Sequence, residues 1–274
     1  MIVRSLGLQT DLLFIRFAGQ VTDRGSYLVA EIPANPTYYW GNFLAMEKPP
    51  RPGDFRRWTE LFEQELGGPS GVGHMTFTWD SVEGGPGDVA PFLAAGFSYD
   101  ESVVLTASSV RKPAKLDSEV QVRPLVSDAD WEAASQNQVA CELLPLDGAP
   151  SFVMFKRRQM AMYRAMADAG LGYWFGAFLG ERLVGDLGLY RDGYVGRFQS
   201  VGTHPGFRRR GICGAMVFAV SSFALERMGL ETLVMSADER YHAALIYETV
   251  GFRPAERNGG LCHPTYRQDQ RRRP

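Results

Sequence analysis

Residues 201–215 have the sequence VGTHPGFRRRGICGA, and the interpretation of the whole chain starts from this stretch. Before it, residues 194–201 alternate loosely between polar and apolar side chains, which predicts a strand. After it, Ile212, Met216 and Val220 recur at the spacing of a buried helix face. The sequence therefore predicts a strand, a tight turn rich in arginine and glycine, and a helix.

The turn between the expected strand and helix has the chemistry of an anion-binding site. The first turn of a helix presents unpaired backbone N–H groups and the positive end of the helix dipole. Glycines at 206, 211 and 214 allow a ligand to approach the backbone, and the arginines at 208–210 add positive charge. An arginine-rich turn is often a solvated surface loop, but the flanking strand and helix favour the anion site here.

The same turn resembles motif A of the GCN5-related N-acetyltransferases, whose pattern is Arg/Gln-x-x-Gly-x-Gly/Ala. Arg208, Gly211 and Cys213 fall on its three fixed positions, with Cys213 replacing the usual Gly or Ala. The resemblance implies that the turn binds the pyrophosphate of acetyl-coenzyme A. It also implies that the main chain near Val201 and Thr203 hydrogen-bonds the pantetheine arm and polarises the thioester carbonyl.

Residues 243–252, AALIYETVGF, resemble motif B of the same family. Tyr247 falls at the position of the tyrosine that donates a proton to the leaving thiolate. A phenol with a pKa of about 10 can do this and still be neutral at pH 7. A tyrosine that only packs in the core is the alternative. The family often has Asn seven residues earlier, where this chain has Arg240.

The general base is not apparent in the sequence. Many relatives use a Glu on the central strand, but residues 197–201 contain none. Asp186, on the preceding expected strand, is the first candidate, followed by Glu142 and His242, and a water relay is equally possible. Cys213 could have a lowered pKa beside the arginines. The family transfers the acyl group directly, however, which argues against a nucleophilic role for this thiol.

These considerations define a candidate site. Its catalytic residues are Tyr247 and Asp186, and its coenzyme-binding residues are Val201, Gly202, Thr203, Arg208, Arg209, Arg210, Gly211, Ile212, Cys213, Gly214 and Arg240.

The first half of the chain is expected to repeat the element order of the second half. From residue 38 the sequence predicts a strand, a helix at 54–66, a strand at 74–79, a short helix at 91–95 and a strand at 102–107. The second half shows the same order from residue 194 onward. The corresponding turn, PPRPGD at 49–54, has three prolines without amide donors and an aspartate at the helix start. It should repel pyrophosphate, so the first half is predicted to be a degenerate copy.

Further elements are expected from short apolar runs and helical periodicity. Strands are predicted at 12–17, 27–32, 120–125, 173–179 and 182–190, and helices at 128–139 and from about 151. The fold class is therefore α/β (α+β), with two acetyltransferase-like domains, each a mixed, mostly antiparallel sheet flanked by helices. We place the domains at 1–112 and 119–274, joined by the polar, proline-containing linker at 111–119.

Composition excludes several other classes of protein. The 274 residues include 29 basic and 31 acidic side chains, so no nucleic-acid partner or membrane surface is expected. No apolar run of about 18 residues predicts a membrane span, and the start lacks the features of a secretory signal. The three cysteines are widely spaced, form no metal-binding pattern and suggest reduced thiols in the cytoplasm.

The expected reaction is acetyl transfer from acetyl-coenzyme A to a primary amine of a small molecule, without a metal. Alternatives within enzymes are transfer to a protein amino terminus or lysine, or to an acceptor of the aminoglycoside or mycothiol-synthase type, where tandem architectures occur. A coenzyme-binding sensor or scaffold without turnover is the alternative from another class. The sequence does not distinguish a monomer from a homodimer.

Overall fold

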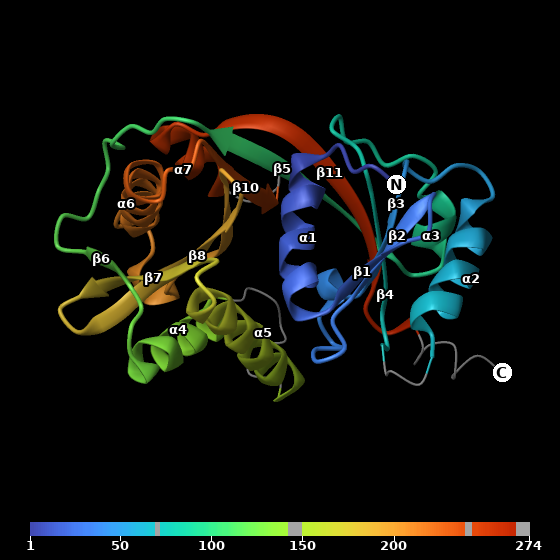
Figure 1. Ribbon diagram of the computed structural model, residues 1–274, viewed down its shortest axis with the longest axis horizontal. Coiled ribbons are helices and arrows are strands. Elements are labelled where there is room, and N and C mark those ends of the chain that lie inside the picture. Colours follow the sequence, from blue (N-terminus) through green and yellow to red (C-terminus); the bar gives the residue numbers. More distant parts are fainter. Residues whose placement is uncertain (69–71, 142–149, 239–242, 267–274) are drawn as a thin grey trace. The chain divides into compact units, whose positions relative to one another are not determined.

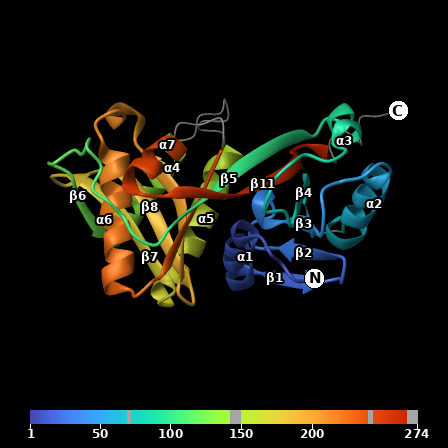
Figure 2. The ribbon, with the colours of Figure 1, turned by 90° about the horizontal axis from the view of Figure 1, so that it is seen from above.

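The computed structural model describes residues 1–68, 72–141, 150–238 and 243–266. The chain divides into two compact units, Met1–Val104 with Ala255–Pro274 and Leu105–Pro254. Figures 1 and 2 show their helices and strands from two directions. The predicted domain boundaries differ from this division, because 105–112 belong to the second unit and 255–274 to the first. The domain boundaries themselves stay a prediction.

The first unit combines helices with a mixed sheet. Its elements are α1 (Leu6–Ala18), β1 (Gln20–Asp23), β2 (Tyr27–Glu31), η1 (Tyr39–Gly41), β3 (Phe43–Met46), α2 (Asp54–Leu66), β4 (Met75–Trp79), α3 (Ala90–Ala94), the start of β5 (Ser98–Ala107) and most of β11 (Arg253–His263). The strand order is β1-β2-β3-β4-β11. β3 and β4 are parallel, whereas the pairs β1–β2, β2–β3 and β4–β11 are antiparallel.

The core of the first unit lies between α2 and the sheet. Trp58, Phe62 and Leu66 recur every four residues along α2 and are almost fully buried. They belong to one apolar cluster with Phe77 and Trp79 of β4. Removing a buried aromatic side chain of this kind typically costs about 3–5 kcal/mol of stability. The first unit therefore has a core of its own.

The second unit has the same kind of sheet. Its elements are the end of β5, β6 (Gln121–Pro124), α4 (Asp128–Ala140), α5 (Pro150–Asp168), β7 (Gly172–Leu179), β8 (Arg182–Asp192), β9 (Val195–Thr203), η2 (Pro205–Phe207), α6 (Ile212–Arg227), β10 (Thr232–Asp238) and α7 (Ala243–Val250). The strand order is β10-β9-β8-β7-β6. β9 and β10 are parallel and the other pairs are antiparallel. The predicted fold class, a mixed and mostly antiparallel sheet flanked by helices, is confirmed.

The expected repeat of element order is present in the structure. β3-α2-β4-α3-β5 in the first half corresponds to β9-α6-β10-α7-β11 in the second, and each series contains one parallel strand pair. The last strand of each series departs from simple duplication. β11 pairs with β4 of the first unit, and β5, whose end belongs to the second unit, is the neighbour of β10 in the strand order.

The strand predicted at 12–17 is wrong, because these residues belong to helix α1. Residues 12–15 are all apolar, and Leu12, Phe14 and Ile15 are nearly fully buried, so no polar residue marks a helical period within this short run. A short buried run of this kind cannot be assigned to helix or strand by periodicity.

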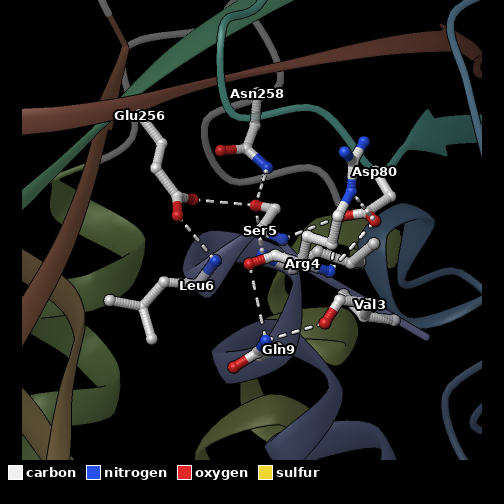
Figure 3. A network of polar contacts seen from close by, with 9 residues as sticks. Val3, Arg4, Ser5, Leu6, Gln9, Asp80, Glu256 and Asn258 are labelled. Carbon is white, nitrogen blue, oxygen red and sulfur yellow. Dashed lines mark hydrogen bonds and ion pairs between the residues drawn. The ribbon is translucent and has the colours of Figure 1, made fainter.

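Distant side chains complete the start of α1 (Figure 3). Ser5 caps the helix and accepts a hydrogen bond from the Leu8 N–H. The Glu256 carboxylate accepts hydrogen bonds from the N–H groups of Leu6 (2.9 Å) and Gly7 (3.1 Å). Asp80 accepts the Ser5 N–H at 2.7 Å. The two carboxylates satisfy orphan donors of the helix start, and both lie far from it in sequence.

Candidate functional site

The start of α6 has an open first turn. Gly211 is its N-cap with φ 91°, and within the described residues no side chain caps the helix. Arg209 also has a positive φ, 65°, which is uncommon for a residue with a side chain. Positive-φ residues of this kind turn successive N–H groups toward one point and form an anion-binding concavity. The turn therefore offers its backbone donors to a ligand.

Gly211 could not be replaced by a larger residue without strain. Its φ disfavours any side chain, and a Cβ there would lie 3.0 Å from the Lys115 carbonyl oxygen and 3.2 Å from the Asp117 nitrogen. At Gly214 a Cβ would lie 3.4 Å from Pro113. The glycines of the turn thus allow the β5–β6 connection to pass close to the helix start.

The three arginines of the turn differ in what they contact. Arg208 donates from Nε to the Thr203 carbonyl and from Nη2 to the Cys141 carbonyl, both at 3.2 Å. Arg210 pairs with Asp117 at 2.9 Å. Arg209 has no ion pair within the described part of the chain. Two of the three guanidinium groups are therefore engaged by the protein, and anion binding would rest mainly on backbone N–H groups and Arg209.

A cavity of about 1160 Å³ opens beside this turn, within the second unit. Most of the predicted site residues line it: Val201, Gly202, Thr203, Arg208, Arg209, Gly211, Ile212, Cys213, Gly214 and Tyr247. Arg210 and Asp186 are not among its described lining residues. Arg240, Glu142 and His242 lie outside the described residues.

Strand β9 has a bulge at the cavity. Asp186 of β8 pairs with Gly202, and Gly188 pairs with Gln199, so Ser200 and Val201 together lie opposite one residue of β8. Ser200 has φ 50°. Bulges of this kind redirect the backbone next to functional sites. Here the bulge brings the Ser200 and Val201 backbone to the wall of the cavity.

The pairing between strands β9 and β10 ends before the bulge. Their parallel pairing covers 195–197 and 232–234. Further along, a second cavity of about 280 Å³ is lined by 197–201 of β9 and 235–238 of β10. Tyr247 of α7 lines both cavities and is 5% exposed. This position agrees with a role at the reacting centre, and the role of its hydroxyl as an acid stays a prediction.

Asp186 of β8 is fully buried. Its carboxylate accepts hydrogen bonds from Asn137 Nδ2 (2.5 Å), Gln138 Nε2 (3.1 Å) and Trp174 Nε1 (2.7 Å). Burial raises the pKa of Asp186 to about 7, although these hydrogen bonds lower it. Gln138 Nε2 also donates to the Ser200 carbonyl at 2.7 Å. The geometry therefore favours a positioning role for Asp186, which holds Gln138 and the bulge in place. Direct contact between Asp186 and an amine is the less favoured role.

Several residues that line the cavity were not found by sequence reasoning. Gln138 and Cys141 come from α4 and its end, Lys156 comes from α5, and 111–115 come from the β5–β6 connection. No motif marks them, because each reaches the cavity through the tertiary fold. The capping-box start of α4 at Ser127 was the one local signal that could have fixed the orientation of that helix.

Cys213 does not have the lowered pKa that its place at a helix start suggested. Burial raises the pKa of Cys213 to about 12, and burial raises that of Cys141 to about 12 as well. Desolvation of the thiolate is the cause at Cys213, and at Cys141 it exceeds the opposite effect of Arg208. Both thiols are therefore protonated at neutral pH, which argues against a nucleophilic role for Cys213.

The described residues contain no group of three or more His, Cys, Asp or Glu side chains placed to hold a metal ion. Among the helices of the described ranges, none has the length and apolar composition needed to cross a membrane.

Comparisons with known proteins agree with the geometry of the second unit. The model of the acetyltransferase (GNAT) family matches residues 140–252. No curated protein matches the chain. Solved structures that share the fold include a GCN5-related N-acetyltransferase from Kribbella flavida, with a TM-score of 0.62 and 13% identity over 96% of this chain and 97% of that one.

Two other solved structures resemble the chain over most of its length. A GCN5-related N-acetyltransferase from Sphaerobacter thermophilus has a TM-score of 0.58 and 18% identity, covering 88% of this chain and 82% of that one. A functionally unknown conserved protein from Staphylococcus epidermidis has a TM-score of 0.70 and 14% identity, covering 90% and 94%. At these identities the likeness shows the fold. The family match alone places an acetyltransferase (GNAT) domain at residues 140–252.

Proposed function

We propose that this chain transfers an acetyl group from acetyl-coenzyme A to a primary amine of a small molecule. One observation carries the proposal: a single cavity is lined by the open start of α6, the bulged backbone of β9 and Tyr247 of α7. These are an anion site, a polar backbone edge and a proton donor, which are the parts that the reaction needs.

The residues of the cavity fit the coenzyme. The N–H groups after Gly211 would hold the pyrophosphate, because no described side chain caps this helix start and Gly211, Ile212 and Cys213 line the cavity. The buried Thr203 hydroxyl has no hydrogen-bond partner among the described residues and lies at the cavity wall, where a polar ligand group can satisfy it. When bound, acetyl-coenzyme A supplies an already activated thioester.

Proton transfer then determines which residues matter for the rate. A C–N bond forms at the carbonyl carbon and the C–S bond breaks, so one proton leaves the amine and one reaches the departing sulfur. Tyr247 donates the second proton. The described lining of the larger cavity contains no Asp, Glu or His, so we assign removal of the first proton to water in the cavity.

The lack of an Asp, Glu or His in the described lining also supports a second candidate function, a coenzyme-binding sensor without turnover. Such a protein needs the anion site but no base, and the described lining provides the former without the latter. Both hypotheses predict that coenzyme A binds. They differ in whether the bound thioester is cleaved when an amine is present.

The test combines binding with turnover. Calorimetry with coenzyme A measures binding, and release of free thiol from acetyl-coenzyme A is then followed across a panel of small amines, amino acids and peptides with free amino termini. Thiol release that depends on one small amine, with the acetylated amine identified by mass spectrometry, supports the enzyme. Tight binding without amine-dependent release supports the sensor. Acetylation of peptides alone would place the acceptor among proteins, and absence of binding would overturn both candidates.

A further inference from the structure

Within the β5–β6 connection, the segment 111–117 is held at both ends. At its start the Arg111 N–H donates to the Val250 carbonyl at 2.8 Å. The Arg111 guanidinium donates to the carbonyls of Thr249 and Glu248, both at 3.1 Å, so this end is fixed to the C-terminus of α7. At the other end Asp117 pairs with Arg210 of the α6 turn. The connection therefore joins the end of α7 to the start of α6.

Between these two anchors the connection passes over the first turn of α6. Pro113 is buried, and its ring lies within contact distance of the position that a Cβ would take at Gly214. The Lys115 carbonyl oxygen lies 3.0 Å from the corresponding position at Gly211. Residues 111–115 all line the large cavity. The connection is thus one wall of the cavity, next to the helix start where a pyrophosphate would bind.

Two lysines of this wall, Lys112 and Lys115, are exposed cations without an acidic partner in the described ranges. Of the arginines around the turn, Arg111 and Arg208 donate to backbone carbonyls and Arg210 pairs with Asp117. Arg209 lies in the turn itself, where it would serve the pyrophosphate. Exposed lysines are common on protein surfaces, and by themselves these two would mean little. Their place on the cavity wall, on a segment fixed at both ends, distinguishes them.

Coenzyme A carries a second anionic group, the phosphate monoester on its ribose. We propose that Lys112 and Lys115 bind this 3′-phosphate, so that the β5–β6 connection forms a subsite that selects coenzyme A over its dephosphorylated form. The inference rests on the proposed binding of coenzyme A, since the cavity must hold the pyrophosphate at α6 for the lysines to reach a neighbouring phosphate. Lysine suits this role, because its compact ammonium group can donate to the oxygen atoms of a phosphate monoester from several directions.

The experiment compares the affinities of coenzyme A and dephospho-coenzyme A, which lacks only this phosphate. Calorimetry on the wild-type chain should show tighter binding of coenzyme A. The double variant Lys112→Ala/Lys115→Ala should lose roughly tenfold in affinity for coenzyme A and little for the dephosphorylated form. Added salt should reduce the difference between the two ligands in the wild type. The control Lys48→Ala/Arg191→Ala removes the same charge at exposed positions away from the cavity and should keep the wild-type ratio.

A conservative variant tests the anchoring. Asp117→Asn keeps the shape of the side chain but weakens the ion pair with Arg210 and should lower the affinity for coenzyme A more than that for dephospho-coenzyme A. Equal affinities of the wild type for both ligands, or an unchanged ratio in the lysine variant, would overturn the subsite and leave the proposed coenzyme binding intact. Failure of the wild type to bind either ligand would overturn the proposed function and the subsite together.

Discussion

The starts of α2 and α6 have nearly the same backbone conformation but differ in charge, because only α2 has an acidic side chain in its first turn. Each helix follows the first strand of a parallel pair, and each has a glycine N-cap with φ 91°, Gly53 in one and Gly211 in the other. In α2 the first helical residue is Asp54, whose carboxylate accepts the Arg51 N–H at 2.9 Å and pairs with Arg57 at 2.8 Å. In α6 the first residue is Ile212, and no acidic side chain lies in the first turn.

The comparison shows how a helix start can keep its backbone conformation and still be unsuited to binding an anion. At the start of α2 the protein has a carboxylate of its own, that of Asp54, which pairs with Arg57. At the start of α1, Glu256 accepts the first N–H groups of the helix. At α6 the corresponding donors face a cavity. A helix start that the protein has not filled with its own acid is where an external anion can bind. We therefore propose that the first unit is a degenerate copy of the second.

The largest expected effect is on coenzyme binding by Gly211→Asp. The substitution puts a side chain at φ 91°, 3.0 Å from the Lys115 carbonyl, and places a negative charge where the pyrophosphate would bind. Affinity for coenzyme A, measured by calorimetry, should fall by about 100-fold or more.

Gly53→Asp is the matched control for this change. It imposes a similar φ, but nothing lies within 4 Å of the added Cβ, and it should leave coenzyme affinity unchanged. Circular dichroism should show that both variants fold. Native affinity in a folded Gly211→Asp protein would mean that α6 is no more an anion site than α2.

The next effect concerns turnover. Tyr247→Phe should slow acetyl transfer by about 100-fold, the usual contribution of a general acid, and change coenzyme affinity little. Tyr194→Phe, at a tyrosine that is 68% exposed, is the control. The rates are measured on the acceptor found in the amine panel, or by thioester hydrolysis if none is found. A Tyr247→Phe variant with native rates at every pH would assign this tyrosine to packing alone.

A third effect should appear in the pH dependence of stability. Because the pKa of Asp186 is raised to about 7 in the folded state, the folded protein holds a proton that the unfolded chain releases above about pH 4. This group therefore makes the free energy of unfolding decrease as pH rises from about 4 to about 7, by up to about 1.4 kcal/mol per pH unit, and adds no slope above that range.

Asp186→Asn removes the titrating group and should flatten the profile between those pH values. Urea unfolding across the range measures it, with Asp192→Asn, an exposed residue at the end of the same strand, as the control. Parallel profiles for wild type and Asp186→Asn would show that the buried carboxylate does not bind a proton in this range.

Local patterns predicted the parts of the molecule whose structure is local. Short sequence motifs pointed to the α6 turn and to Tyr247 within α7, and both line one cavity in the structure. The helix α1 was missed because its apolar run at 12–15 shows no helical period, and because Asp80 and Glu256, which complete its start, are far away in sequence. The burial of Asp186 was also out of reach, since it depends on donors from α4 and β7. The start of α1 and the burial of Asp186 both depend on tertiary contacts, which a local sequence pattern does not contain.

The smallest expected effect is also the most direct test of the degenerate copy. Asp54→Ala removes the carboxylate from the start of α2, and the loss of its hydrogen bond should cost about 1 kcal/mol of stability. It should not create a second coenzyme site, because Pro49, Pro50 and Pro52 still lack N–H groups before the helix. Calorimetry should therefore give one site per chain for the wild type and for the variant. A second site in the wild type would refute the idea that the turn has lost its ligand, whereas a second site only in Asp54→Ala would show that the carboxylate alone had excluded the coenzyme.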